Sequence, residues 1–501
     1  MQNNFLDSLE KIVGSENIIL DIQQREELSK DKCTKNLFEQ KRPCAVVVKV
    51  SKDGYACSLL ALIFLVRKYG QKIIVRGGGS GVCGALVPQK PLNTVMVDIT
   101  SLNEIFEINR NQGFVVCGAG ILGLQLEESV NEHDYTLGHS PASLAISTPG
   151  GWIATRSSGQ FSSRYGTVEE LVLGIEVFTG DGRALWTEKT DDLKNFFRME
   201  GTNGIITKVK MKIFPRSRCK RFMTISLPNT KTALRIMEKL SLFRSDLEER
   251  KVFLSSLRLY DWLDFKIISK PHKKETGNKN KAKFFFEKAM LRHPQIVNFL
   301  AKFLKKSTMI LMLESNEEVG LRFACRQIRN ICWEKGTNKW WREENEEWSK
   351  NWYENRFKLG HDKVVEHAKE GIIVDTFDCS GNFEKLPTIY QKVKKSVANL
   401  AILGAHFGMD RNTPYIYFTF AAISRNEENK SDLHNKIWRK ILDACRQNGG
   451  LTTHHHGIGL LKAGLDNSLV PFAYGHNWLE EAQKAKNKFD PDNTFNPSKI
   501  I

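Results

Sequence analysis

The stretch of sequence that decides the fold runs from Gly138 to Gly166 and reads GHSPASLAISTPGGWIATRSSGQFSSRYG. Small and hydroxyl-bearing residues dominate it for more than 20 positions. Such residues make a poor hydrophobic core, but they let a backbone pass close to a large polar ligand and offer it hydrogen bonds. The stretch therefore predicts a binding surface for an extended polar ligand.

Two further glycine-rich segments flank this stretch. RGGGSGVCG spans residues 76–84 and follows an apolar strand pattern at 72–75, and EGTNGII spans 200–206 at the start of another strand pattern. Successive glycines let backbone N–H groups converge on an anion. Three such loops around one β-rich region predict a dinucleotide rather than a lone phosphate, although a tight turn without a ligand is the alternative for each loop.

Residues 79–84 also match the GxGxxG pattern, so a Rossmann site has to be considered. That motif needs a helix directly after the glycines and an acidic residue at the end of the next strand. Pro88 and Pro91 break any such helix, and Asp98 comes too early. A phosphate-cradling loop without a helix is therefore the better prediction.

Composition excludes several classes of protein. The 501 residues allow two to four domains, and 41% hydrophobic with 26% charged residues is typical of a globular protein rather than a disordered or fibrous one. The formal charge of +17 favours anionic partners such as phosphates, anionic lipid surfaces or nucleic acid. Because no nucleic-acid-binding module is recognisable, no nucleic-acid partner is expected.

The cysteines and the chain ends bear on the cellular compartment. None of the ten cysteines forms a CxxC pair, which predicts free, mostly buried thiols in a reducing compartment and no metal site. The longest uncharged stretch near the N-terminus, Tyr55–Val66, has 12 residues, too few to span a membrane. With no signal peptide before it and no peroxisomal signal at residues 497–501, a cytoplasmic location is expected.

Changes in residue composition and periodicity divide the chain into four parts. Residues 1–40 read as a helical lead-in, residues 41–215 as a ligand-binding domain, residues 216–445 as a second domain richer in lysine, tryptophan and helical periodicity, and residues 446–501 as a C-terminal segment. Helices are expected at 5–13 and 55–69, a charged connector at 25–41, and strands at 45–50, 72–75, 94–98, 114–117, 171–178, 206–213 and 309–313.

The order of these three loop motifs resembles the FAD-binding domain of the vanillyl-alcohol-oxidase class of flavoproteins. Within that class the middle motif is most similar to the alkylglycerone-phosphate synthase family. The resemblance implies an α+β fold: a two-subdomain FAD-binding domain of the p-cresol-methylhydroxylase type, an α+β substrate domain, and a C-terminal segment whose histidine triplet completes the active site. It also implies a homodimer.

The cofactor implied by the resemblance is FAD, bound without a covalent link. The implied FAD contacts are Val75, Arg76, Gly77, Gly78, Gly79, Ser80, Gly81, Ala142, Ser143, Leu144, Ala145, Ile146, Ser147, Thr148, Thr155, Arg156, Ser157, Ser158, Glu200, Gly201, Thr202, Asn203, Gly204, Ile205 and Ile206.

The resemblance also implies catalytic residues, which are Arg258, Tyr417, His454, His455 and His456. Lys363 stands where the family carries an arginine that contacts substrate, and residues 490–497 resemble the terminal motif of the superfamily. Lysine keeps the charge but loses bidentate recognition, so the substrate is expected to differ from the family's.

Residue chemistry by itself leaves these roles open. A histidine triplet on a strand would alternate, so that His454 and His456 converge while His455 points away, and it would serve as a base, a phosphate donor, a metal site or a structural element. Tyr417 shares one face of a predicted strand with Tyr415. Its hydroxyl would shuttle a proton if a neighbouring His or Arg lowered its pKa, and it is otherwise a structural tyrosine. Arg258 supplies positive charge near the flavin or a phosphate, or is a surface arginine.

The function implied is exchange of the acyl chain of acyl-dihydroxyacetone phosphate for a fatty alcohol, in ether-lipid synthesis and without net redox change. The oxidised flavin would be the electrophilic anchor and the triplet would supply the base. Because residues 457–462 look more like flavin-dependent D-lactate and glycolate dehydrogenases, oxidation of a 2-hydroxy acid is the main alternative. A non-catalytic anion-binding flavoprotein is the third.

A lysine-rich segment, Lys270–Lys306, predicts contact with an anionic membrane. After Pro294, apolar residues at 296, 299, 300, 303 and 304 follow helical spacing with lysines beside them, the pattern of an interfacial helix. A core-facing helix is the alternative. The tryptophans between 333 and 352 would line an alkyl tunnel, lie at a lipid interface or pack a helix.

Overall fold

The chain folds into two compact units in the computed structural model. The structure describes residues 3–39, 42–268, 287–301, 303–304, 306–333, 342–357, 361–424, 430–464, 467–475 and 477–500. Unit 1 comprises residues 1–159, 166–216 and 455–501, and unit 2 comprises residues 160–165 and 217–454. The predicted lysine-rich loop at 270–283 lies outside the described residues.

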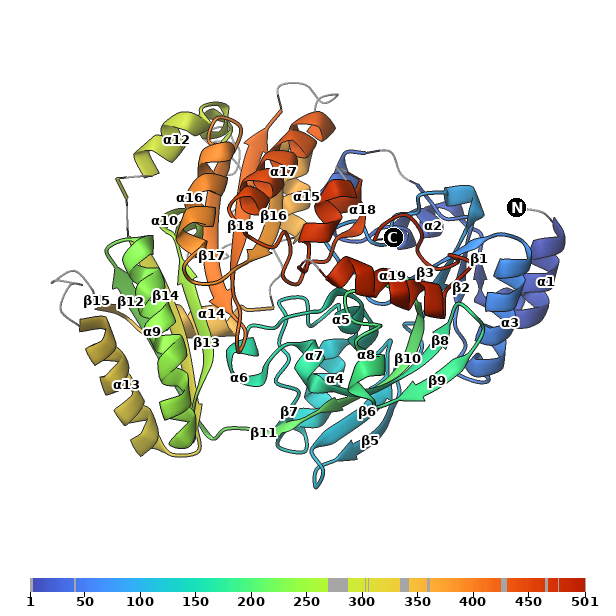
Figure 1. The fold of residues 1–501 in the computed structure, drawn as a ribbon, viewed down its shortest axis with the longest axis horizontal. Helices are drawn as coiled ribbons and strands as arrows, with labels where there is room; N and C mark the ends of the chain where they lie inside the picture. The colour runs from blue at the N-terminus through green and yellow to red at the C-terminus, as the bar shows by residue number, and fades with distance from the viewer. Residues whose placement is uncertain are drawn as a thin grey trace, which may run out of the picture. The chain divides into compact units, whose positions relative to one another are not determined.

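Unit 1 begins with a four-stranded sheet of order β1-β2-β4-β3 (Figure 1). The strands are β1 (Ile18–Ile19), β2 (Val46–Lys49), β3 (Lys72–Arg76) and β4 (Thr94–Asp98), and β2, β4 and β3 run parallel. Continuous Val and Ile runs form these strands because both faces are covered. Helix α3 (Tyr55–Lys68) connects β2 to β3, and α1 (Asn3–Val13) packs on it through buried Phe5.

The second sheet of unit 1 is antiparallel, with order β5-β6-β10-β8-β9. Its strands are β5 (Ile105–Asn109), β6 (Phe114–Gly118), β8 (Val172–Thr179), β9 (Ala184–Thr187) and β10 (Gly204–Lys212). On β10, Val209 and Met211 are buried, while the alternating lysines 208, 210 and 212 are half-buried. This confirms the predicted strand with one polar face.

Shorter elements complete unit 1. They are α2 (Ile22–Leu28), α4 (Gly123–Asn131), β7 (Tyr135–Thr136), α5 (Pro149–Thr155), α7 (Val168–Leu171), α8 (Thr190–Leu193), β11 (Phe214–Pro215), α18 (Gly459–Ala463) and α19 (Trp478–Phe489), with 3-10 turns at Ser15–Asn17, Thr34–Leu37, Pro91–Asn93 and Asn467–Phe472. The predicted connector at 25–41 thus contains a helix, because Asp21 accepts a hydrogen bond from the N–H of Gln24 and caps α2.

Unit 2 is built on a seven-stranded antiparallel sheet of order β15-β12-β14-β13-β17-β18-β16 (Figure 1). The strands are β12 (Cys219–Leu227), β13 (Val252–Tyr260), β14 (Ser307–Ser315), β15 (Arg342–Glu344), β16 (Ile372–Ser380), β17 (Ile402–Met409) and β18 (Pro414–Ile423). All nine residues of β14 are buried, as expected for a central strand.

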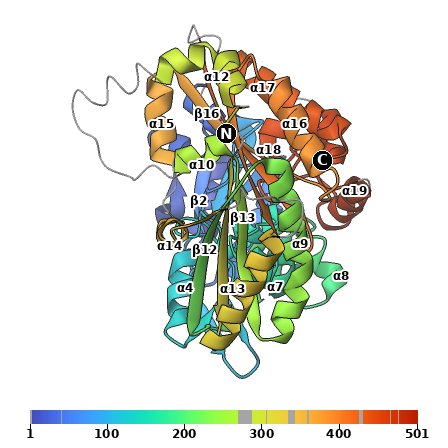
Figure 2. The same cartoon turned by 90° about the vertical axis from the view of Figure 1, so that its left-hand side faces the viewer.

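One layer of helices covers one face of this sheet. Its members are α9 (Thr230–Glu249), α13 (Glu318–Trp333), α16 (Leu386–Ser396) and α17 (Lys430–Gln447). Figure 2 shows α9 and α13 beside β12 and β13. Further helices of unit 2 are α6 (Ser162–Tyr165), α10 (Trp262–Ile268), α12 (Pro294–Ala301), α14 (Glu347–Glu354) and α15 (His361–Lys369).

The structure bears on three sequence-based expectations: the domain boundaries, the conformation of the histidine triplet and the absence of a membrane-spanning helix. Residues 160–165 and 446–454, which we had assigned to the first domain and to the C-terminal segment, belong to unit 2. The histidine triplet follows a bridge at Leu451 and lies in a loop, so the predicted alternation of its side chains is wrong. No helix among the described residues has the length and apolarity needed to cross a membrane.

Candidate functional site

The first two glycine-rich segments pack directly against each other in unit 1. A Cβ on Gly77 would collide with the hydroxyl of Thr148, and a Cβ on Gly78 with the carbonyl oxygen of Ile146. Neither segment has room for another atom there. The close approach predicted from the glycines is, at these two positions, an approach between two loops of the chain, which places Gly77 and Gly78 beside residues 146–148.

The other predicted segments join the same group. A Cβ on Gly159 would meet the backbone of Ser140, and a Cβ on Gly201 would lie 3.8 Å from the Cβ of Val75. No helix follows the glycines at 77–84 before the 3-10 turn at Pro91–Asn93, which excludes the Rossmann arrangement. Segments far apart in sequence thus form one surface of backbone and small side chains.

Buried polar atoms on this surface lack a hydrogen-bond partner among the described residues. The hydroxyls of Ser140 and Ser158 are buried without a hydrogen bond, and so is Nδ1 of His139. Burial lowers the pKa of His139 to about 3, so its ring is neutral, and Nε2 lies 3.1 Å from the Ser157 hydroxyl. Since buried hydroxyls normally find a partner, this surface fits a ligand rich in hydrogen-bonding groups, as FAD is.

Several side chains that we predicted to contact FAD form hydrogen bonds or ion pairs within the protein. Arg76 donates to the carbonyls of Leu28 and Lys30, at 2.9 and 3.0 Å. Arg156 forms an ion pair with Glu169 at 2.7 Å. The hydroxyl of Thr148 caps α5, and that of Ser147 accepts from the Trp152 indole at 2.8 Å. The polar atoms of these side chains are therefore engaged within the protein, and whether these residues contact FAD stays a prediction.

Glu200 and the C-terminal motif hold the loops in place. The Glu200 carboxylate accepts hydrogen bonds from the N–H groups of Ile458 and Gly459. Asp490 accepts from the N–H groups of Thr494 and Phe495 at 3.0 and 2.8 Å, and Asn496 donates to the Glu200 carbonyl at 2.7 Å. Because Asn496 and Thr494 also pair with Ile73 on β3, the strand that leads into the first glycine loop is fixed from both sides.

Unit 2 carries a polar row across four neighbouring strands. Tyr260 pairs with His406, His406 with Tyr417, and Tyr417 with Asp378. Directly paired residues point to the same face of a sheet. Their neighbours Phe407, Phe418 and Phe377 contact Tyr390 of α16 or Trp438 of α17 on the opposite face. The polar row therefore lies on the face away from this helix layer.

Arg258 is the cation of this polar face. Its Nη1 lies 3.3 Å from Nε2 of His406, its Nη2 lies 3.4 Å from the Tyr415 hydroxyl, and its guanidinium lies over the Trp352 ring. Nε is buried without a hydrogen-bond partner, and no described carboxylate pairs with this arginine. An arginine left without a counter-charge in a buried setting fits an anionic ligand.

His406 and Asp264 were missed by the sequence analysis. Nδ1 of His406 lies 2.8 Å from the Asp264 carboxylate. Arginine only donates, so in neutral His406 Nε2 accepts from Arg258 and the ring proton sits on Nδ1, facing Asp264. A single histidine in a strand pattern gives no signal in the sequence, because its partners come from β13 and α10.

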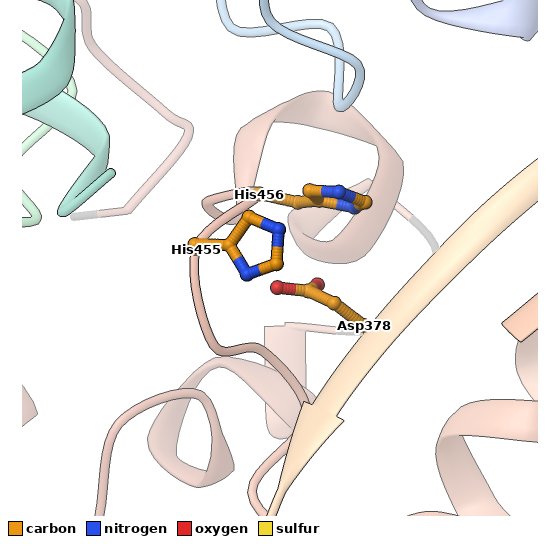
Figure 3. Close-up of side chains that lie close together, drawn as sticks. All are labelled: Asp378, His455 and His456. Carbon is orange, nitrogen blue, oxygen red and sulfur yellow. The ribbon is translucent and has the colours of Figure 1, made fainter. Parts of the chain in front are cut away.

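The histidine triplet spans the boundary between the units. His454, the last residue of unit 2, is buried with Nε2 3.2 Å from the Asp410 carboxylate and its ring stacked on Tyr415. Asp378 accepts the backbone N–H of His454 at 2.8 Å. Figure 3 shows Asp378 with His455 and His456, whose rings meet edge to face at 4.7 Å.

The pKa of Tyr417 is raised rather than lowered. Burial raises it well above its usual range, and the Asp378 carboxylate raises it further. The condition of a pKa lowered by a neighbouring His or Arg is therefore not met, although the ring stacks on His406 at 4.6 Å. A protonated Tyr417 remains suited to donating a hydrogen bond or a proton.

The remaining predicted positions lie apart from this row. Lys363 is exposed on α15, a helix that packs against β16, and no described hydrogen bond or ion pair joins it to the polar row. Of the tryptophans, Trp333 is 74% exposed, Trp352 lies under Arg258, and residues 340 and 341 lie outside the described chain. All ten cysteines are free thiols and seven are buried, as expected.

Comparisons with known proteins find two family matches along the chain. Residues 56–188 match the family described as FAD binding domain, and residues 236–500 match the family described as FAD linked oxidases, C-terminal domain. The solved structure of p-cresol methylhydroxylase with substrate bound superposes with a TM-score of 0.72 at 12% identity, over 99% of this chain and 96% of that one.

Curated relatives have different activities. The alkyldihydroxyacetonephosphate synthase of Trypanosoma brucei brucei is 25% identical over 99% of this chain and 80% of its own length. The D-lactate dehydrogenase of Archaeoglobus fulgidus is 22% identical over 91% of each chain.

The structure and these comparisons agree on an α+β, p-cresol-methylhydroxylase-type FAD-binding fold followed by an oxidase-type C-terminal domain. Because the second match, residues 236–500, alone covers more than half of the 501 residues, this chain belongs to the family of FAD-linked oxidases.

Proposed function

We propose that this enzyme is an FAD-dependent alkyl transferase, which exchanges the acyl chain of acyl-dihydroxyacetone phosphate for a fatty alcohol without net oxidation. The observation that carries the proposal is Arg258, a cation on the polar face of unit 2 that no described carboxylate neutralises. A phosphorylated substrate supplies the missing charge. The similarity to a named alkyldihydroxyacetonephosphate synthase over 99% of this chain supports the same substrate class.

FAD is the proposed cofactor, held without a covalent link by the loops of unit 1. Backbone groups of residues 77–81 and 146–148, together with the unpartnered hydroxyls of Ser140 and Ser158, are its proposed contacts. Bound there, the flavin supplies an electrophilic centre that side chains of the protein lack.

Unit 2 supplies charge and protons. Arg258 binds the phosphate, and the Asp264–His406 pair holds the guanidinium from one side. His454 is the proposed base for the proton next to the substrate carbonyl, because the Asp410 carboxylate stabilises the charge it gains. Tyr417, kept protonated by burial, donates to the departing carboxylate.

Oxidation of a 2-hydroxy acid is the second candidate. A carboxylate satisfies Arg258 as well as a phosphate does. The alignment with the D-lactate dehydrogenase of Archaeoglobus fulgidus covers 91% of this chain, which supports this second candidate.

The test is product analysis with simultaneous flavin spectroscopy. The purified full chain, given palmitoyl-dihydroxyacetone phosphate and labelled hexadecanol, is expected to form alkyl-dihydroxyacetone phosphate and palmitate in equal amounts while the flavin absorbance at about 450 nm stays constant. Arg258→Gln should raise KM for the phosphorylated substrate by about tenfold or more, since a charge-assisted contact is lost. Arg221→Gln is the matched control, because Arg221 pairs with Glu318 at the surface.

Two results contradict the proposal. One is rapid bleaching of the flavin by D-lactate or glycolate with no alkyl product, which would establish the second candidate. The other is an unchanged KM in Arg258→Gln, which would remove the arginine from substrate recognition.

A further inference from the structure

An apolar surface lies exposed on α12 and the turn that follows it. We name it the α12 face, and its large side chains are Ile296, Phe299, Leu300, Phe303 and Leu304, which are 53%, 56%, 56%, 69% and 44% exposed. Phe299 and Phe303 touch edge to face with ring centroids 5.3 Å apart. The core-facing alternative for this helix is therefore wrong, because the predicted stripe points outward.

The opposite side of the helix is tied to unit 2. The amide of Asn298 donates to the carbonyls of Ala398 and Ala401, at 3.1 and 2.8 Å, just before β17. Pro294 and Leu291 are buried at the start of the helix. In Figures 1 and 2, α12 lies at the outer edge of unit 2. The α12 face is therefore held outward by packing and hydrogen bonds on its reverse side.

The surroundings of this face are basic. From Lys288 to Leu313 the chain has five Lys or Arg residues and no Asp or Glu. Of the described side chains, Arg292 and Lys306 are exposed at the two ends of the face. Lys288 already pairs with Glu370 at 2.7 Å, so the exposed charges at the ends are the ones available to a partner.

We propose that the α12 face docks on the surface of an anionic lipid bilayer. A short helix with an outward apolar stripe and cations at its margins can insert its aromatic side chains among acyl chains while the cations meet lipid phosphates. A second copy of this chain is a poorer occupant, because a two-fold contact through this face would bring the same cations together. The inference stands independently of the substrate proposed above.

The experiment is co-sedimentation of the full-length protein with vesicles. We expect binding to vesicles of phosphatidylcholine with about 30% phosphatidylserine, little binding to phosphatidylcholine alone, and loss of binding as salt rises from about 0.1 to 0.5 M. Phe299→Ser with Phe303→Ser should weaken binding by about tenfold or more, since the two aromatic side chains proposed to insert into the bilayer are lost. Phe64→Ser is the matched control, because Phe64 is 68% exposed on α3 in unit 1.

A charge variant separates the two contributions. Arg292→Glu with Lys306→Glu leaves the apolar stripe intact and should weaken binding to anionic vesicles by about tenfold or more. Flavin absorbance and circular dichroism, unchanged in both variants, establish that the fold is intact.

Three outcomes overturn the proposal. Equal binding to neutral and anionic vesicles would remove the electrostatic part, and wild-type binding by the serine variant would place the membrane contact elsewhere. A wild-type protein that ignores vesicles but dimerises, with the serine variant monomeric, would assign the α12 face to a second copy.

Discussion

At the scale of single residues, the candidate site depends on which side chains are already satisfied. Arg76 and Arg156, two of the predicted FAD contacts, are already engaged: Arg76 donates to backbone carbonyls and Arg156 pairs with Glu169. Arg258 lies within hydrogen-bonding distance of His406 and Tyr415, and no described carboxylate pairs with it. The cost of leaving an arginine buried without a counter-charge is what marks Arg258 as a binding residue.

The two tyrosines of β18 are expected to have different roles. Tyr417→Phe should lower kcat by about 10²-fold with little change in KM, because its hydroxyl is the proposed proton donor to the leaving carboxylate. Tyr415→Phe should mainly raise KM, because the Tyr415 hydroxyl contacts the substrate-binding Arg258 at 3.4 Å. Steady-state kinetics on both variants, with flavin content as a control for folding, checks this split.

If Tyr417→Phe retains normal turnover, the proton donor lies elsewhere on the polar row. A drop in kcat for Tyr415→Phe alone would transfer the role to that residue.

At the scale of elements, close packing between loops is what makes the glycines of 77–81 necessary. Gly78 does not have a positive φ, so its need for glycine comes from contact with residue 146 rather than from backbone conformation. The same segment also contains Gly79, whose φ of 66° is left-handed and favours glycine for a second reason.

Gly78→Ala is therefore expected to disrupt the cofactor surface. The new methyl group collides with the backbone of Ile146, which cannot yield as a flexible side chain would, and such overpacking costs about 1–3 kcal/mol of stability. We expect a lower melting temperature and less bound FAD, measured by thermal unfolding and by flavin absorbance per protein.

Gly151→Ala is the matched control for this variant. Gly151 lies in α5, has an ordinary φ, and its Cβ would come only within 3.4 Å of the Thr148 hydroxyl. Alanine should be neutral or stabilising there, since it favours the helix. Equal loss of FAD in both variants would show that the close approach at Gly78 does not matter.

At the scale of the whole molecule, the two units divide the proposed work: unit 1 offers a surface of small residues for a large polar cofactor, and unit 2 offers charged and protic side chains on a rigid sheet. The formal charge of +17 favours anionic substrates and surfaces for the protein as a whole.

FAD is expected to leave the protein when it unfolds. Residues 138–166 contain no cysteine, and their one histidine, His139, packs with its ring against Trp152 and with Nε2 toward Ser157. Precipitation in acid should therefore release all flavin to the supernatant, measured by its fluorescence. Yellow precipitate, or a flavin-labelled peptide after digestion, would establish a covalent link instead.

The sequence by itself determined the local features of this protein. Strands 94–98 and 206–213 were predictable because their apolar runs and alternation follow from the strand period, and the start of α12 because proline begins a helix well. The three glycine-rich loops were predictable as segments of close backbone approach, because glycine permits such an approach whatever group lies opposite it.

Only the tertiary structure decided which side chains work together. His406, Asp264 and Asp410 stand alone in the sequence. In the structure His406 contacts Arg258, Asp264 contacts His406, and Asp410 contacts His454. The loop conformation of the triplet likewise depends on Asp378, which is distant in sequence. The pKa of Tyr417 is raised first by burial and then by the Asp378 carboxylate. Periodicity fixes the face of a strand or helix on which a residue lies. Its charge partner and its burial depend on which distant segments pack against it, and the sequence of one segment does not indicate which those are.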